Sequence, residues 1–198
     1  MRSSFPPAYT TASVVFAILA AVPFLDGCVP AVIAAGAGYT AVVANDQRST
    51  GAQLDDESIE LKIATSAGSK WGNEVHLNAT SYNGIVLLTG EAPSTVVQDE
   101  ITKIAKSTDR VRSVQNEMVI GPVTDLAART NDTYITSKVK TRLLEDEKFK
   151  ALYVKVVTER SVVYLMGIMT RQEGEAAAQV AATTAGVARV VKVFEYKP

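Results

Sequence analysis

The sequence predicts an α+β fold made of two copies of one small domain. The chain has 198 residues, of which 47% are hydrophobic and 21% are charged, enough apolar material for one ordinary domain or two small ones. From residue 55 onward the sequence repeats with a period near 76, which is too long for a solenoid unit and suits two homologous domains. In both copies, helical and strand periodicities follow one another in the same order.

The two copies align with few gaps. Ile59 aligns with Ile135, and Lys62 aligns with Lys138, at an offset of 76. The offset becomes 77 in the hairpin region and returns to 76 in the last strand. One insertion and one deletion therefore account for the whole alignment.

The first copy opens with an amphipathic helix and continues into a hairpin. Ile59 and Ile63 lie four residues apart, the spacing of one helix face. Residues 75–80 alternate apolar and polar side chains, as a half-buried strand does, and Asn83-Gly84 is a strong hairpin-turn signal. The elements predicted after this turn are a return strand at 85–89, a helix at 97–105 and a last strand at 111–120.

The second copy predicts the same elements in the same order. Its opening helix carries apolar residues at Ile135, Val139 and Leu143, and the order α-β-β-α-β therefore occurs twice. Three strands covered on one face by two helices form a two-layer sandwich, the smallest arrangement that hides both the sheet face and the helix stripes. The other predicted elements are strands at 154–158, 162–166 and 187–196 and a helix at 175–185.

The beginning of the chain has the features of a bacterial lipoprotein signal. Arg2 precedes an uncharged apolar run at residues 11–25, which is shorter than the ~20 residues that a membrane-spanning helix needs. The run ends in Leu-Asp-Gly-Cys at Cys28, which resembles the lipobox. In that family the cysteine thiol is diacylated, the peptide bond that precedes the cysteine is cut, and the new amino terminus is acylated. Cys28 is therefore the predicted lipid anchor. The alternative is a buried free cysteine in an ordinary apolar element.

A tether is predicted between the anchor and the folded part. Residues 29–44 are small and uncharged and contain two glycines, so they offer little to pack. The alternative is a second, membrane-inserted hairpin in this segment. The predicted organisation is a signal peptide at 1–27, a lipidated tether at 28–54, one domain at 55–121, a linker at 122–130 and a second domain at 131–198.

The twin repeats resemble BON domains. The similarity rests on the strand ends Leu-Thr-Gly at 88–90 and Leu-Met-Gly at 165–167, and on last strands of the pattern Val-x-x-Val. With the lipid cysteine and the tether, this order is similar to that of two-BON outer-membrane lipoproteins of Gram-negative bacteria. The resemblance implies a lipoprotein that is anchored in the outer membrane through acylated Cys28, faces the periplasm and supports envelope integrity at the division site. It brings no catalytic activity and no cofactor.

Composition narrows the remaining function classes. Twenty Lys and Arg residues nearly balance 21 Asp and Glu residues, which gives no global basic surface for nucleic acid. One cysteine and one histidine exclude a disulfide framework and metal sites built from several cysteines or histidines. His76 lies on the polar side of an alternating strand, which favours a solvated histidine. We therefore predict no catalytic residue, no metal site and no nucleic-acid partner.

The opening helices of the two copies differ in charge. Residues 55–68 carry four acids and one lysine, whereas residues 131–144 carry one acid, two lysines and one arginine. A cation near an anionic bilayer contributes about 1 kcal/mol, so only the second helix favours an anionic surface. Tyr134 adds an aromatic ring with a polar tip, which suits headgroup depth. The alternative is a solvated charged face with Tyr134 packed against its own domain.

The resemblance places phospholipid binding on this same helix, with phosphatidylglycerol and cardiolipin as the expected ligands. The competing hypothesis is a protein-interaction adaptor for an outer-membrane assembly factor or for a regulator of cell-wall amidases. The residues predicted to bind phospholipid are Tyr134, Ile135, Ser137, Lys138, Thr141 and Leu144.

Overall fold

A computed structural model describes residues 46–146 and 154–197, which fall in one compact unit, residues 38–198. The first domain contains α3 (Thr50–Trp71), a short 3-10 helix (Gly72–Glu74), β1 (His76–Tyr82), β2 (Ile85–Ala92), α4 (Thr95–Ser107), β3 (Ser113–Asn116) and β4 (Val119–Ile120). The second domain contains α5 (Leu126–Glu145), β5 (Lys155–Glu159), β6 (Val162–Met169), α6 (Arg171–Ala182) and β7 (Arg189–Tyr196). The predicted α+β class and the repeated order α-β-β-α-β are confirmed.

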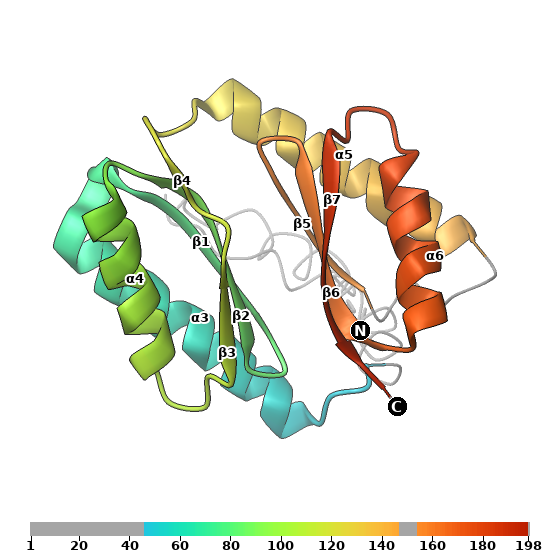
Figure 1. Cartoon of the computed structure of the whole chain (residues 1–198), viewed down its shortest axis with the longest axis horizontal. Helices are drawn as coiled ribbons and strands as arrows, with labels where there is room; N and C mark the ends of the chain where they lie inside the picture. The colour runs from blue at the N-terminus through green and yellow to red at the C-terminus, as the bar shows by residue number, and fades with distance from the viewer. Residues whose placement is uncertain (1–45, 147–153, 198) are drawn as a thin grey trace, which may run out of the picture. The chain divides into compact units, whose positions relative to one another are not determined.

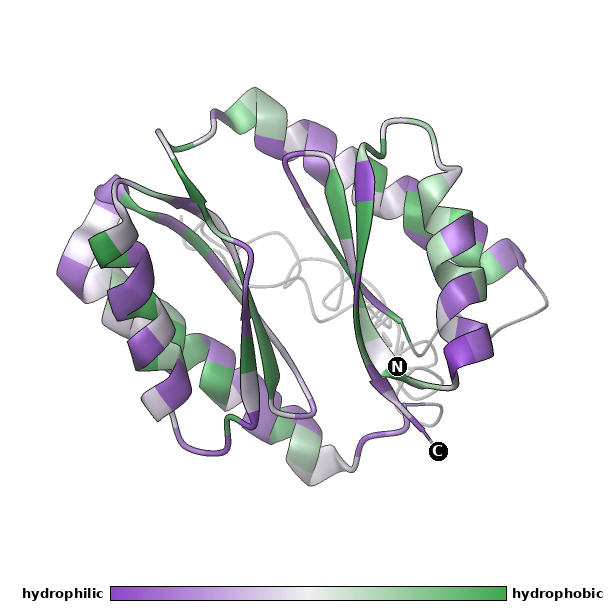
Figure 2. Ribbon diagram, viewed as in Figure 1, coloured by the Kyte–Doolittle hydropathy of each residue, from purple (hydrophilic) through white to green (hydrophobic). Residues whose placement is uncertain are grey.

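Each domain is a mixed sheet with two helices on one face (Figure 1). Strand β1 pairs antiparallel with β2, which also pairs parallel with β3 and β4. Likewise, β5 pairs antiparallel with β6, and β7 pairs parallel with β6. Hydrophobic residues run along the strands of both sheets, while the helices alternate in hydropathy around their circumference (Figure 2). A separate apolar core therefore lies between each sheet and its own helices.

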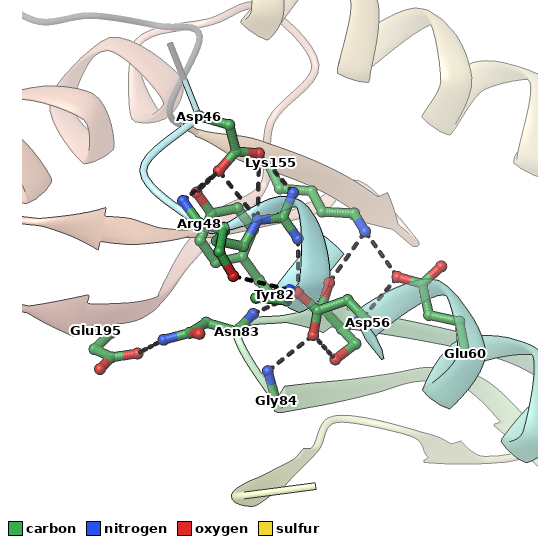
Figure 3. Close-up of polar contacts among 12 residues, drawn as sticks. Asp46, Arg48, Asp56, Glu60, Tyr82, Asn83, Gly84, Lys155 and Glu195 are labelled. Atoms are coloured by element: carbon green, nitrogen blue, oxygen red, sulfur yellow. Dashed lines mark hydrogen bonds and ion pairs between the residues drawn. The ribbon is translucent and has the colours of Figure 1, made fainter. Parts of the chain in front are cut away.

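A buried aspartate ties the opening helix of the first domain to its hairpin turn. Asp56 on α3 accepts the backbone N–H of Asn83 at 2.7 Å and of Gly84 at 2.8 Å (Figure 3). Its carboxylate also accepts the hydroxyl of Ser81 at 2.6 Å and the guanidinium of Arg48 at 2.7 Å. Burial by itself raises the pKa of Asp56, but these four donors outweigh it and lower the pKa below its ordinary value.

The second domain repeats this device with fewer donors. Asp132 on α5, which aligns with Asp56, accepts the backbone N–H of Arg160 at 2.7 Å and of Ser161 at 2.8 Å. Both turn residues have positive φ, 52° and 62°, the conformation that a tight two-residue hairpin requires. The sequence alignment places the two aspartates in register, but we did not predict their shared role.

The structure shortens the predicted tether at 28–54. Helix α3 begins at Thr50, where Ser49 caps it by accepting the N–H of Ala52. The side chain of Arg48 is only 13% exposed, because it lies between the carboxylates of Asp46 and Asp56. A buried carboxylate is stable only with a partner of opposite charge. Because Arg48 is that partner for Asp56, the end of the predicted tether packs against the first domain.

Two other element boundaries differ from the predictions. Helix α5 begins at Leu126, inside the predicted linker at 122–130, because Asp125 caps it by accepting the N–H of Ala128. The last strand of the first domain is interrupted between β3 and β4. Here the side chain of Asn116 accepts the N–H of Met118, and the Met118 side chain turns into the core.

The two domains contact each other through a third apolar cluster and several ion pairs. Lys155 of the second domain lies 2.7 Å from Glu60 on α3, and Arg112 lies 2.8 Å from Glu195 on β7. The buried members of the shared cluster are Tyr82, Leu87, Val157, Tyr164 and Met166.

Candidate functional site

Helix α5 presents two distinct faces. Its inner face carries Asp132, Ile135, Val139 and Leu143, which are all buried. Ile135 is 1% exposed and belongs to the core of the second domain. The prediction that Ile135 contacts phospholipid is therefore wrong, because Ile135 lies on the buried face of α5 with Val139 and Leu143.

The outer face of α5 exposes large apolar and aromatic side chains. Tyr134 is 62% exposed and Leu144 is 63% exposed, so both are available at the surface, as predicted. Leu126 in the first turn is 78% exposed. We did not predict Leu126 as a site residue because the second domain was expected to begin at residue 131. The Asp125 cap just before Leu126 is the signal that could have placed it on this helix.

Hydroxyl groups occupy much of the same face, and most of them are already hydrogen bonded. Thr130 donates to the carbonyl of Leu126, Thr133 donates to that of Arg129, and Ser137 donates to that of Thr133. Each bond runs back to the residue four positions earlier. These hydroxyls therefore do not depend on water for a hydrogen-bond partner, which lowers the cost of moving the face into an interfacial environment. Thr141, another predicted residue, is exposed on α5.

The cationic side chains of α5 differ in whether they form hydrogen bonds with the rest of the second domain. Lys138 donates to the carbonyl of Ala185, and its ammonium lies 4.5 Å from the centre of the Tyr134 ring. Arg142 donates to the carbonyl of Val180 near the end of α6 at 3.3 Å. Lys140 is exposed beside the outer face. Thus Arg142 bonds to α6, Lys138 bonds to the loop that follows α6, and Lys140 is exposed.

Comparison with known proteins identifies the family. A BON domain model matches residues 55–122 and 131–198. The outer membrane lipoprotein DolP of Haemophilus influenzae is 41% identical over 181 residues, covering 90% of this chain and 93% of that protein. This chain belongs to the DolP family of BON-domain proteins. The predicted resemblance is confirmed.

Two other relatives are less similar. A 21 kDa hemolysin of Actinobacillus pleuropneumoniae is 35% identical over 76% of this chain and 79% of that protein. The osmotically-inducible protein Y of Escherichia coli is 26% identical over 69% of this chain and 70% of that protein. The similarity to these two proteins thus extends over most of each chain.

A second polar site of this BON-domain protein lies where its two domains meet. A cavity of about 430 Å³ is lined by His76 of the first domain and by Arg129, Ser137, Lys140 and Glu159 of the second, among others. His76, which we interpreted as a solvated side chain, is partly buried at the domain boundary, with 22% of its side chain exposed. Burial and the positive charge of Arg129 lower the pKa of His76, so the imidazole is neutral near pH 7.

Glu159 has the most perturbed carboxyl group at this second site. Burial, together with the charges of Glu91 and Asp132, raises its pKa to about 7. Glu91 is fully buried, with 0% of its surface exposed. The predicted lipid anchor, Cys28, lies outside the described residues. The candidate sites in the described part of the chain are therefore the outer face of α5 and this interdomain site.

Proposed function

We propose that this protein is a lipoprotein of the outer membrane whose helix α5 binds anionic phospholipid headgroups. Acylated Cys28 anchors it and leaves both BON domains in the periplasm, where they support envelope integrity during division. The printed name of the Haemophilus relative, an outer membrane lipoprotein, supports this location. Within the described residues, no helix is long and apolar enough to cross a membrane.

The observation that carries the proposal is the outer face of α5. Leu126, Tyr134 and Leu144 offer apolar surface along the whole helix, while the hydroxyls between them are satisfied by the helix itself. Such a face can enter the interfacial layer of a bilayer without leaving buried donors unpaired. Phosphate groups supply the charge that the neighbouring lysines attract.

Lysine positions around this face fit a phosphate ligand. Lys140 is exposed, and Lys138 keeps its ammonium near the Tyr134 ring, which lies at the surface. The acid Asp132 lies on the inner face, and its carboxylate is bonded to the hairpin turn, so it is not part of the outer face that carries Tyr134.

Vesicle flotation tests the proposal. A chain of residues 38–198, which form one compact unit, lacks Cys28 and so reports on binding without the acyl anchor. We expect it to float with vesicles that contain phosphatidylglycerol or cardiolipin and to stay behind with phosphatidylcholine vesicles. Binding to neither kind of vesicle would overturn lipid recognition and favour the adaptor hypothesis. Equal binding to both kinds would overturn the role of the lysines.

A further inference from the structure

Three potential metal ligands meet at the boundary between the two domains. His76 on β1 and Glu91 on β2 are paired residues of the antiparallel hairpin, and Glu159 lies at the end of β5. The ligand atoms of these three side chains lie within 4.8 Å of one another. His76 Nε2 is 3.7 Å from Glu159 Oε1. The three side chains come from three strands and from both domains.

Burial distinguishes this cluster from ordinary surface acids. Glu91 and Glu159 are both buried, at 0% and 6% exposure. Two carboxylates that share a buried site repel each other and are stable only when protons or cations compensate them. A cation held between them would satisfy both at once.

Neighbouring threonines orient the two carboxylates. Thr124 donates its N–H and its hydroxyl to Glu91 Oε2, each at 3.2 Å. Thr89 donates its hydroxyl to Glu159 Oε2 at 3.4 Å. In both residues, therefore, Oε2 is held by a threonine, while Oε1 of Glu159 faces His76 at 3.7 Å and Oε1 of Glu91 faces the half-exposed Arg160 guanidinium at 3.4 Å. Outer hydrogen bonds of this kind are typical around metal-ligating carboxylates.

We propose that His76, Glu91 and Glu159 bind a divalent transition-metal cation of the Zn²⁺ type that links the two domains. One imidazole and two carboxylates are a common ligand set for such cations, and they leave a further position for water. Ligand atoms around tetrahedral zinc lie about 3.4 Å apart. The three groups therefore need to move inward by about 1 Å, which changes of side-chain torsion can supply.

Three other charged residues act on this site. Arg160 lies 3.4 Å from Glu91 Oε1 and competes with the metal, but its side chain is half exposed and can turn to solvent. Arg129 acts electrostatically on both His76 and Glu159 and opposes a cation. Asp132 acts on Glu159 and favours one. Removing the Arg160 guanidinium is therefore expected to strengthen metal binding.

Calorimetric titration with Zn²⁺ and absorption spectroscopy with Co²⁺ test the proposal on residues 38–198. Cys28 lies outside this chain and His76 is the chain's one histidine, so imidazole ligation has one possible source. We expect one Zn²⁺ per chain and a higher unfolding temperature with the metal bound. The His76→Ala and Glu159→Gln variants should each weaken binding by at least about tenfold. The Arg160→Asn variant should tighten it.

Glu60→Gln provides the matched control. Glu60 is also a carboxylate at the domain boundary, but it pairs with Lys155 away from the cluster. Its variant should bind Zn²⁺ as the parent chain does. Circular dichroism of each variant confirms that it is folded. Absence of saturable binding below about 100 μM in the folded parent, or equal binding by His76→Ala and Glu60→Gln, overturns the proposal.

Discussion

The opening helices α3 and α5 share an inner face and differ on the outer one. Each buries an aspartate followed by apolar residues at the same spacing, beginning with Asp56 and Ile59 in one and with Asp132 and Ile135 in the other. Over its full length α3 carries four acids and two lysines, whereas α5 carries four cations and two acids. The two copies therefore share the buried residues that pack each helix against its own sheet, whereas the residues on the exposed face differ.

The two aligned aspartates also differ in the number of hydrogen bonds that they accept. Asp56 receives the Arg48 guanidinium and the Ser81 hydroxyl in addition to the two backbone groups of the turn. Asp132 has the equivalent two backbone donors in the second domain. The hairpin of the first domain is therefore held by a charged network that includes the residues just before α3.

The largest expected effect is on stability, and it tests this asymmetry. Asp56→Ala leaves the largely buried Arg48 guanidinium and two backbone donors without their acceptor, so we expect it to cost about 3–5 kcal/mol. Asp132→Ala should cost about 1–3 kcal/mol, because it removes bonds to neutral donors. Urea unfolding monitored by the fluorescence of Trp71, the chain's one tryptophan, reports on the first domain. Amide hydrogen exchange reports on the second. Equal losses for the two variants would contradict the asymmetry.

Acid should weaken the first domain through the same aspartate. The folded-state pKa of Asp56 is lowered, so its contribution is present above the unfolded value near 3.8 and is lost as pH falls through the folded value. We expect the stability reported by Trp71 to fall steeply below about pH 4. In Asp56→Asn this fall should be shallower. If the stability of the parent and that of the variant fall equally with pH, another carboxylate is responsible for the acid sensitivity.

Much of this architecture could be predicted from the sequence because it depends on local periodicity. The helical repeat at Ile59 and Ile63 and the Asn83-Gly84 turn are local signals, and they identified α3 and the β1–β2 hairpin. Helix starts were missed where capping decides them, since Ser49 and Asp125 act through single hydrogen bonds rather than through a hydrophobic pattern.

The interdomain site could not be predicted for a different reason. His76 and Glu159 are 83 residues apart and meet only because the two sheets pack against each other. Alternation along β1 correctly marks His76 as a polar-side residue, but it does not show that a second domain covers that side. The exposed residues of α5 were largely identified, since they follow from helical spacing, whereas Ile135 was misplaced despite its alignment with the core residue Ile59.

Charge reversal at aligned lysines tests whether α5 is the privileged lipid site. Lys138→Glu removes one attraction and adds one repulsion, so we expect a loss of about 2 kcal/mol, or roughly thirtyfold, in binding to phosphatidylglycerol vesicles at low salt. Lys62→Glu, at the aligned position of α3, should change binding little. Flotation at several salt concentrations should show the Lys138 effect shrinking as salt rises. Equal effects at both positions would remove the distinction between the helices.

Loss of the aromatic ring should have a smaller effect that persists in salt. Tyr134 is exposed next to Lys138, and burial of its ring in the headgroup layer is an apolar contribution that salt does not screen. We expect Tyr134→Ala to weaken vesicle binding by about 1 kcal/mol, or roughly fivefold, at low and high salt alike. A loss that disappears at high salt would mean that the ring acts only by positioning the Lys138 ammonium.

The smallest expected effect is a gain, and it has a matched control on the other helix. Tryptophan is favoured at the membrane interface even more than tyrosine, because its larger ring combines an apolar body with one N–H donor. Tyr134→Trp should therefore strengthen vesicle binding by about twofold to threefold. Ser58→Trp places the same ring at the aligned, exposed position of the acidic helix α3. It should add little, and its fluorescence should not shift to the blue when phosphatidylglycerol vesicles are added, whereas that of Trp at position 134 should. A comparable gain and shift at both positions would mean that any exposed aromatic ring suffices, and that the outer face of α5 has no special fit to the bilayer.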